Sequence, residues 1–432
     1  MTDEMIKPQW LDLKRSGQLV IGENTHLALS LPNGLELIVS FLSGVAQRAT
    51  VAPINPGYKQ QEALTILRRI QPSLLLVSCH GPVTQAAHDL SIPAASCVWD
   101  SESSMIRLQL VSKVYEPCPT PPVAPSHMSP EDNALMLFTS GTTGTSKCVV
   151  LTHHNLLVAV SIIARAHGLS PVDRCALITP LFYVAGVGAS ILTTLFSGGA
   201  VSGVTWYHAV RTLHRLLLTF PQPSNMPALR FIRSGGSSLA PVTLQRLEEE
   251  LATPVLEIYG MTETAPGIFC NRLEGAAFHL ATRSHRSGKD PVMTDQIGVV
   301  GEICVRGPSI MYGYVDNPEA NEDSFTIRLT GRIKEIINKG GEKIDPTEVE
   351  QIFHAHEAIR EVVCFRIKDE TYGEEIVALN EGHDLNARQV KMYARENAVS
   401  FKAPKQVVFL EVIPRGQTGK YQRQLLSSQY GS

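Results

Sequence analysis

Between Leu27 and Val77, short apolar segments alternate with segments of helical periodicity. The stretches ATVAPINPGY and SLLLV have the apolar character of buried strands, whereas ELIVSFLSGVAQ and QQEALTILRRIQ place apolar residues at helical spacing. A strand–helix–strand repeat connects parallel strands, and the connecting helices cover both faces of the sheet. The sequence therefore predicts an α/β fold.

The composition is that of a large globular protein. Of the 432 residues, 44% are hydrophobic and 18% are charged, which suits two or three domains with a sizeable core. The formal net charge of −3 gives no electrostatic reason to expect nucleic acid or an anionic membrane as a partner. Small molecules are the expected partners, and no feature indicates an oligomeric state.

The cysteines and the chain termini bear on the compartment. Eight cysteines without a CxxC pair are typical of reduced thiols rather than of a disulfide framework or a zinc site. The N-terminal residues lack the apolar core of a signal peptide, and the C-terminal Gln-Tyr-Gly-Ser is not a peroxisomal SKL-type address. We therefore expect a cytoplasmic location rather than a peroxisomal one.

Two other features have an ordinary explanation. Residues 176–207 contain no charged side chain, but Pro180 and five glycines favour a buried core element over a membrane span. His354 and His356 lie two residues apart, so on a helix they point to different faces. We expect surface histidines there and no metal site.

The run LFTSGTTGTSK, from Leu137 to Lys147, contains six hydroxyl side chains, two glycines and one lysine after an apolar stretch. Glycine N–H groups can approach phosphate oxygens closely, hydroxyls donate hydrogen bonds and the ammonium adds positive charge. A P-loop has Gly directly before its Lys and Ser or Thr directly after it, whereas Ser146 and Cys148 stand here. The run indicates another kind of polyphosphate loop, with a simple solvated loop as the alternative.

This run and the following VVLTHHNL resemble the adenylate-forming superfamily of acyl-CoA synthetases, luciferases and peptide-synthetase adenylation domains. LPNGLELIVSFL and VAPINPGY are similar to further family segments. SGGSSL (Ser234–Leu239) resembles the turn that lines adenine, and EIYGMTE (Glu257–Glu263) resembles the YGxTE motif. The longer form LRFIRSGGSSLAP looks most like the branch of small- to medium-chain and dicarboxylic acyl-CoA synthetases. The resemblance runs through nearly the whole chain.

The resemblance implies ATP, Mg²⁺ and coenzyme A as cofactors. The expected catalytic residues are Lys420, Thr262 and Glu263. Lys420 is expected to bridge the acyl carboxylate and the α-phosphate, Thr262 to touch the α-phosphate, and Glu263 to hold Mg²⁺. The other expected nucleotide and CoA ligands are Thr139, Ser140, Gly141, Thr142, Thr143, Gly144, Lys147, Gly235, Gly236, Ser237, Glu257, Tyr259, Gly260, Met261, Arg332, Lys339, Gly340 and Gly341.

Within that set, individual roles also follow from the resemblance. Tyr259 is expected to stack on adenine and Arg332 to contact ribose. Lys334 is expected to be the hinge of a mobile domain. Lys339, Gly340 and Gly341 are expected to flank the pantetheine arm of CoA, where glycines leave room for a narrow thiol.

The family architecture implies two domains. Residues 1–330 are expected to form a large N-terminal adenylation core of parallel-type sheets covered by helices. Residues 331–432 are expected to form a small α+β lid domain that carries Lys420. The residues themselves favour a separate unit there, because Val349, Ile352, Phe353 and Ile359 keep helical spacing before the strand-like VVCFRI.

The sequence also departs from the family pattern. Phe325 is followed by only six residues before Arg332, which leaves no room for the TGD motif whose aspartate clamps ribose in the family. Asp316 and Asp323 belong to a preceding family segment and are not substitutes. Tyr183 replaces a usual histidine beside the acyl pocket, and Cys148 replaces a glycine. The chain resembles a shortened member.

Three functional hypotheses follow. The first is an AMP-forming acyl-CoA ligase that activates an aliphatic or aryl carboxylic acid with ATP and transfers it to the CoA thiol, in fatty acid or secondary metabolism. The second is a degenerate homologue that binds nucleotide or acyl ligand without turnover, favoured by the missing aspartate. The third adenylates an acid and loads it on a carrier protein.

Overall fold

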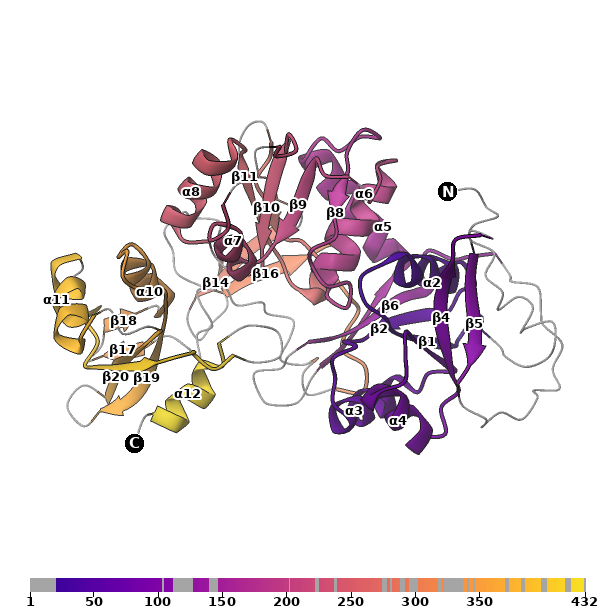
Figure 1. Ribbon diagram of the computed structural model, residues 1–432, viewed down its shortest axis with the longest axis horizontal. Coiled ribbons are helices and arrows are strands. Elements are labelled where there is room, and N and C mark those ends of the chain that lie inside the picture. Colours follow the sequence, from indigo (N-terminus) through magenta and orange to yellow (C-terminus); the bar gives the residue numbers. More distant parts are fainter. Residues whose placement is uncertain are drawn as a thin grey trace.

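The computed structural model of the protein describes most of the chain from residue 21 onward. The described residues are 21–102, 105–111, 127–139, 147–201, 203–221, 225–236, 239–273, 278–279, 282–287, 292–294, 302–317, 321, 337–339, 342–344, 346–369, 373–381, 385–397, 402–415 and 421–430. Figure 1 shows two large sheets with their helices and a smaller C-terminal unit at one end.

The first sheet contains seven strands, mostly parallel. In spatial order they are β5 (Met105–Leu110), β4 (Ala94–Asp100), β3 (Leu74–Val77), β1 (His26–Ser30), β2 (Thr50–Pro53), β6 (Asn133–Thr139) and β7 (Lys147–Thr152). β5 and β7 run antiparallel to their neighbours. The predicted alternation of strands and helices between Leu27 and Val77 is confirmed, with α2 (Leu35–Ala46) and α3 (Gln60–Ile70) as the helices.

Helices cover both faces of this sheet, as the apolar strands require. α2 contributes Leu37, Ile38 and Phe41 to the core on one face. α3 and α4 (Pro82–Asp89) pack on the other face through residues such as Leu67 and Val83. Figure 1 shows α2 on one side and α3 and α4 on the opposite side. Two-sided burial explains why these strands are apolar at successive positions.

The second sheet has six strands. In spatial order they are β13 (Phe278–His279), β12 (Phe269–Cys270), β11 (Val255–Tyr259), β10 (Phe231–Gly235), β9 (Trp206–Ala209) and β8 (Cys175–Ala176). β8 to β11 are parallel. α7 (Arg211–Leu217) and α8 (Pro241–Leu251) cover its outer face, and α8 has Pro241 in its first turn, where proline is favoured.

A middle layer of helices packs between the two sheets. α5 (His153–Ala166) contacts the core of the first sheet through Leu156 and Ala159, and β11 and β12 through Ile163. The π-helix η2 (Ala185–Leu192) continues into α6 (Thr193–Phe196) and contributes Val187 and Ile191 to the same core. The charge-free stretch is thus core, and no helix of the described residues is long and apolar enough to cross a membrane.

A third, antiparallel sheet is small. It contains β15 (Val292–Thr294), β14 (Thr282–Ser287) and β16 (Glu302–Arg306), in that spatial order. The chain leaves β16 toward the residues that complete the candidate site described below.

The C-terminal unit is α+β, as expected. Its sheet contains β18 (Glu342–Ile344), β17 (Ile337–Lys339), β20 (Gly373–Glu381), β19 (Glu361–Asp369) and β21 (Gln406–Leu410), with helices α10 (Pro346–His354), α11 (Ala387–Asn397) and α12 (Arg423–Tyr430). α10 and α11 pack on one face and α12 on the other. The expected boundary between residues 330 and 331 lies outside the described residues.

Two expectations about this unit were wrong. Ile359 is buried but lies beyond the end of α10 at His354, so it does not belong to that helix. His354 is not a surface histidine, because both of its ring nitrogens are buried. Burial, together with the nearby charges of Arg211 and Arg215 from α7, lowers the pKa of His354 to about 3. The N-terminal part of the protein, through α7, therefore contacts α10 of the C-terminal unit.

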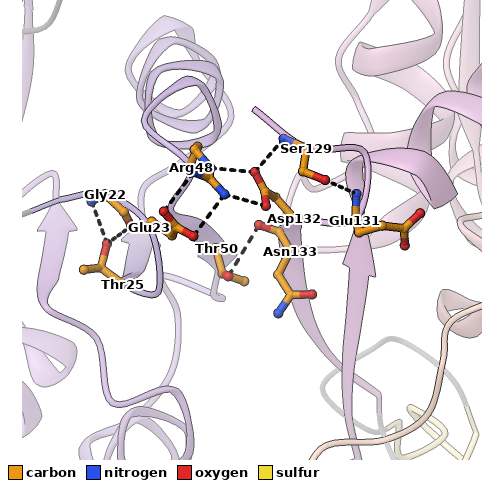
Figure 2. Close-up of polar contacts among 9 residues, drawn as sticks. All are labelled: Gly22, Glu23, Thr25, Arg48, Thr50, Ser129, Glu131, Asp132 and Asn133. Carbon is orange, nitrogen blue, oxygen red and sulfur yellow. Dashed lines mark hydrogen bonds and ion pairs between the residues drawn. The ribbon is translucent and has the colours of Figure 1, made fainter. Parts of the chain in front are cut away.

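Ion pairs join segments that are far apart in the chain. Arg215 Nη1 donates to Glu361 Oε2 of β19 at 2.6 Å. Figure 2 shows that Arg48, which follows α2, donates to both carboxylate oxygens of Asp132 (2.7 and 2.9 Å) and also to Glu23. The hydrogen bond from Arg48 lowers the pKa of Asp132. The pair holds the end of α2 beside the turn that leads into β6.

Gly44 shows how closely α2 packs on the first sheet. A methyl group at this position would lie 2.8 Å from side-chain atoms of both Leu27 and Val51. We predict that Gly44→Ala lowers the free energy of unfolding by about 1–3 kcal/mol, because the added carbon overpacks this contact. Urea denaturation measures the difference. Gly22→Ala is the control, since its added carbon meets only one atom, at 3.8 Å; equal stability of both variants would contradict the close packing.

Candidate adenylation site

The predicted phosphate loop connects two paired strands. Thr139 is the last residue of β6 and Lys147 the first residue of β7, and the two are register partners in the antiparallel ladder. The loop therefore leaves and returns at one place on the edge of the first sheet. Its inner residues, Ser140, Gly141, Thr142, Thr143 and Gly144, lie outside the described residues.

Glu263 lies on a short 3₁₀ helix, η3 (Thr262–Thr264), which follows β11 of the second sheet. Its side chain is buried, and Tyr314 donates its hydroxyl to Glu263 Oε1 at 2.6 Å. The backbone is fixed too, because Met311 N–H donates to the Glu263 carbonyl at 3.0 Å. The hydrogen bonds to the side chain and to the backbone of Glu263 together fix the orientation of its carboxylate.

Tyr314 also contacts the base of the phosphate loop. The ammonium nitrogen of Lys147 lies 4.7 Å from the centre of the Tyr314 ring, a cation–π distance. The backbone of the same segment pairs with β7, through a bridge between Val149 and Tyr314 and a bond from Val315 N–H to the Cys148 carbonyl at 3.1 Å. One tyrosine therefore links Lys147 of the first sheet to Glu263 beside the second.

Asn155 explains why the segment that carries Tyr314 stays in place. Thr152 caps α5 by accepting from Asn155 N–H, and the Asn155 side chain accepts from Thr152 N–H. The side-chain NH₂ group of Asn155 donates to the backbone carbonyls of Pro308 (2.7 Å) and Ile310 (3.1 Å). The family-like VVLTHHNL thus anchors a segment about 150 residues away in sequence.

The SGGSSL turn is built around glycines that no other residue can replace without strain. A carbon added to Gly235 would lie 2.8 Å from His208 and from Ile258, and Gly236 has φ +82°. Glu257 accepts from Leu239 N–H at 3.4 Å and so holds the far end of the turn against β11. Ser237 lies outside the described residues.

The EIYGMTE motif continues from β11 into η3. Gly260 is required because an added carbon would lie 1.9 Å from the Pro266 carbonyl oxygen. Tyr259 lies beside Phe269 of β12, with ring centres 6.1 Å apart, and burial raises the pKa of Tyr259. Met261 and Thr262 are half-buried at the start of η3. The motif therefore brings Tyr259, Thr262 and Glu263 close together at the end of one strand.

Of the residues that are expected to act from the lid domain, only Lys339 lies in the described part of the chain. Lys339 ends β17, and its ammonium lies 2.9 Å from Glu375 Oε1 inside the C-terminal unit. Arg332, Lys334, Gly340, Gly341 and Lys420 lie outside the described residues, so their roles stay predictions. The side chain of Lys339 is committed to Glu375, which leaves its backbone as the part that could flank CoA.

The two substituted positions have clear surroundings. Cys148 is buried in β7, and burial raises its pKa to about 11, so its thiol is neutral. Tyr183 is half-buried with its ring 4.6 Å from that of Phe182, and burial raises its pKa as well. Cys148 directly follows Lys147 in β7, and Tyr183 lies two residues before η2.

Two residues of the site were not predicted from the sequence, Tyr314 and Asn155. Tyr314 stands in YGY, and its partner Glu263 is 51 residues away, so no local pattern connects them. Asn155 could be recognised as a capping residue, but its contacts with residues 308 and 310 depend on the fold.

The oxygen ligands present suit Mg²⁺ bound with phosphate. Glu263 is a buried carboxylate with one oxygen occupied by Tyr314 and no ion pair among the described residues. Mg²⁺ is usually held by one or two carboxylates together with substrate phosphates and water. No group of three or more His, Cys, Asp or Glu side chains forms a metal cage within the described ranges. The site thus suits a metal that arrives with nucleotide.

Comparisons with known proteins define the class. The family model of the AMP-binding enzymes matches residues 18–315, and that of the AMP-binding enzyme C-terminal domain matches residues 348–420. The first match alone covers more than half of the chain. The protein belongs to the AMP-binding enzyme family, and specifically to the acyl-CoA synthetases of the adenylate-forming superfamily.

Individual relatives agree with this. The chain is 39% identical to acyl-CoA synthetase FUM10 of Gibberella moniliformis, with 95% of this chain and 89% of the relative covered. It is 34% identical to an oxalate–CoA ligase of Arabidopsis thaliana, covering 94% and 88%. ATP-bound MatB of Rhodopseudomonas palustris has the same fold, with a TM-score of 0.81 at 22% identity and 98% and 91% coverage.

The alignment with FUM10 extends over 495 positions, which is more than the 432 residues of this chain. That relative therefore contains internal segments without a counterpart here. The predicted membership, α/β fold and ligase class are confirmed, and the chain is a shortened relative of FUM10. Which nucleotide contacts the missing residues supply in relatives stays a prediction.

Proposed function

We propose that this protein activates a carboxylic acid with ATP and Mg²⁺ and transfers the acyl group to coenzyme A. A carboxylate oxygen of the acid attacks the α-phosphorus of ATP. The bond from the α-phosphorus to the oxygen bridging to the β-phosphate breaks, so that acyl-AMP forms and pyrophosphate is released. The CoA thiol then attacks the acyl carbonyl carbon, loses its proton, and AMP leaves. The ligase class follows from family membership, whereas the residue roles and the metal belong to the proposal.

The observation that carries the proposal is the link through Tyr314 between Lys147 and Glu263. The loop that ends at Lys147 can hold the β- and γ-phosphates. The carboxylate of Glu263, on the other side of the Tyr314 ring, can hold the cation that neutralises these phosphates. When bound, Mg²⁺ would lower the repulsion between the phosphate charges and the attacking carboxylate. The chain keeps these parts although the ribose-clamping motif is missing.

Three further residues are proposed to bind the nucleotide and to stabilise the transition state. Thr262, next to Glu263 on η3, would donate to the α-phosphate, and Tyr259, at the end of β11, would face the adenine. Lys420, by its resemblance to the family lysine, would stabilise the charge that develops between the carboxylate and the α-phosphate. We propose an aliphatic or aryl acid as substrate, and a cytoplasmic location.

The direct test is pyrophosphate release from ATP and Mg²⁺ with a panel of aliphatic and aryl carboxylic acids. We expect release with at least one acid, followed by thioester formation when CoA is added. Thioester on a carrier-protein thiol but not on CoA would contradict the proposed acceptor. Tight ATP binding without release for any acid would contradict the proposed activity.

Lys420→Ala tests the transition-state role. We expect pyrophosphate release to fall on the order of 100-fold or more, because the missing ammonium acts on charge that peaks in the transition state. The dissociation constant of ATP, measured by isothermal titration calorimetry, should change little. Lys402→Ala, on the same domain, serves as the control. An equal loss of ATP affinity and turnover in Lys420→Ala would contradict this role.

Tyr314→Phe tests the support of the metal-holding carboxylate. The variant keeps the ring under Lys147 but removes the hydroxyl bonded to Glu263, so we expect the Mg²⁺ concentration for half-maximal activity to rise about tenfold. ATP binding without metal should change little, because the ring contact persists. Tyr312→Phe is the matched control, since the Tyr312 hydroxyl bonds the exposed Glu131 at 2.6 Å. Identical Mg²⁺ titrations of Tyr314→Phe and the wild type would contradict the proposal.

A further inference from the structure

Asn321, in the segment YVDNPEANEDSF, holds the backbone of Tyr314. Its side-chain oxygen Oδ1 accepts a hydrogen bond from Tyr314 N–H at 2.7 Å, and its Nδ2 donates to the Tyr314 carbonyl at 3.0 Å. Only one orientation of the amide satisfies a donor and an acceptor together, so the two bonds also fix the Asn321 side chain. The contact is made to the tyrosine that links Lys147 and Glu263.

The two bonds complete the pairing of Tyr314, which lies beside β7. Val149 of β7 and Tyr314 form an antiparallel bridge, in which Val315 N–H donates to the Cys148 carbonyl at 3.1 Å. Because the neighbouring residue makes this bond, the N–H and carbonyl of Tyr314 itself point away from β7. Tyr314 is buried, and a buried backbone group without a partner costs free energy. Asn321 therefore takes the place that a further strand would have.

The local backbone is suited to this contact. Asp316 has φ +51°, in the left-handed region that Asp adopts more readily than most residues. Asn321 N–H donates to the Asn317 carbonyl at 3.1 Å, which brings the chain back toward Tyr314. Gly313 leaves room for the amide, because an added carbon there would lie 3.1 Å from Asn321 Oδ1.

The position of the Tyr314 backbone determines where its hydroxyl lies. The hydroxyl donates to Glu263 Oε1 at 2.6 Å, and hydrogen bonds between two oxygens seldom extend beyond about 3.0 Å. A backbone displacement of roughly 1 Å would therefore break this bond. Asn155 bonds carbonyls that precede Tyr314 in the chain, whereas Asn321 bonds Tyr314 itself.

We propose that Asn321 is a positioning residue for the metal: it holds Tyr314 where the hydroxyl orients the Glu263 carboxylate toward nucleotide-bound Mg²⁺. This inference rests on the metal site of the proposed function. Groups that bond a metal ligand change metal affinity when they are replaced, and Asn321 acts through such a group. A purely structural asparagine would close the turn without a selective effect on the metal. The two roles therefore differ in metal-dependent ATP binding.

Asn321→Ala removes both bonds to Tyr314. The dissociation constant of ATP is measured by isothermal titration calorimetry on the full-length protein, with excess Mg²⁺ and with EDTA. We expect the constant with Mg²⁺ to rise about tenfold, and the constant with EDTA to stay within about twofold of the wild type. Glu263→Gln gives the affinity without the metal-holding carboxylate. Val315→Ala is the matched control, because its side chain is exposed in the same segment, and it should match the wild type.

A second variant keeps the test decisive if the alanine variant does not fold. Asn321→Asp keeps the shape and the acceptor for Tyr314 N–H but loses the donor to the carbonyl, so the constant with Mg²⁺ should rise about threefold. The melting temperature of each variant checks that the fold is intact. Equal weakening of ATP binding with and without Mg²⁺ would make Asn321 a structural residue and overturn the inference, as would unchanged binding in every folded variant.

A double variant tests whether Asn321 acts through the Tyr314 hydroxyl. Tyr314→Phe already lacks that hydroxyl, so adding Asn321→Ala should leave the ATP dissociation constant with Mg²⁺ within about twofold of Tyr314→Phe alone. Two independent effects would instead multiply, to about a hundredfold above the wild type, and would overturn the inference.

These binding measurements separate the inference from the proposed function, because they do not require turnover. If Asn321→Ala selectively weakens metal-dependent ATP binding while no acid releases pyrophosphate, the proposed ligase function fails and the inference stands. If pyrophosphate is released but Mg²⁺ changes ATP binding equally in the wild type, Asn321→Ala and Glu263→Gln, the inference fails and the ligase function stands.

Discussion

The hydrogen bond from Tyr314 to Glu263, with Lys147 above the same ring, is the contact on which the candidate site depends. The two charged residues come from different sheets, and neither sheet alone determines the distance between them. The side chain of Tyr314 sets that distance, because its hydroxyl donates to the Glu263 carboxylate and the face of its ring attracts the Lys147 ammonium. The loop base and the carboxylate are therefore arranged before nucleotide binds.

Local features throughout the core support this arrangement. Asn155 ties the segment that carries Tyr314 to the first turn of α5, and α5 itself contacts both sheets. Gly260 lets the chain pass under Pro266 and turn into η3. The side chain of Asn33, in the LPNG segment, bonds the backbone at Leu177, Thr179 and Leu181, which joins the first sheet to the second. These contacts hold together the two sheets that contribute residues to the site.

Much of the fold and part of the site could be predicted from the sequence. The strand–helix alternation after Leu27 depends on local periodicity, which a sequence displays directly. Thr139, Lys147, Tyr259 and Glu263 could be named because they stand in ordered family motifs. Tyr314 could not, because an aromatic residue in a loop gains a role only through a partner that is far away in sequence. His354 was misjudged for a related reason, since its burial depends on packing that local spacing does not show.

The central claim concerns one place where phosphate and metal meet. The most direct measurement is the anomalous difference map of a crystal grown with ATP and Mn²⁺ in place of Mg²⁺. The account predicts a Mn²⁺ peak at about 2.1 Å from a Glu263 carboxylate oxygen, with the triphosphate between that ion and Lys147. A triphosphate bound elsewhere, or a metal peak away from Glu263 with the Tyr314 contact unchanged, would contradict it.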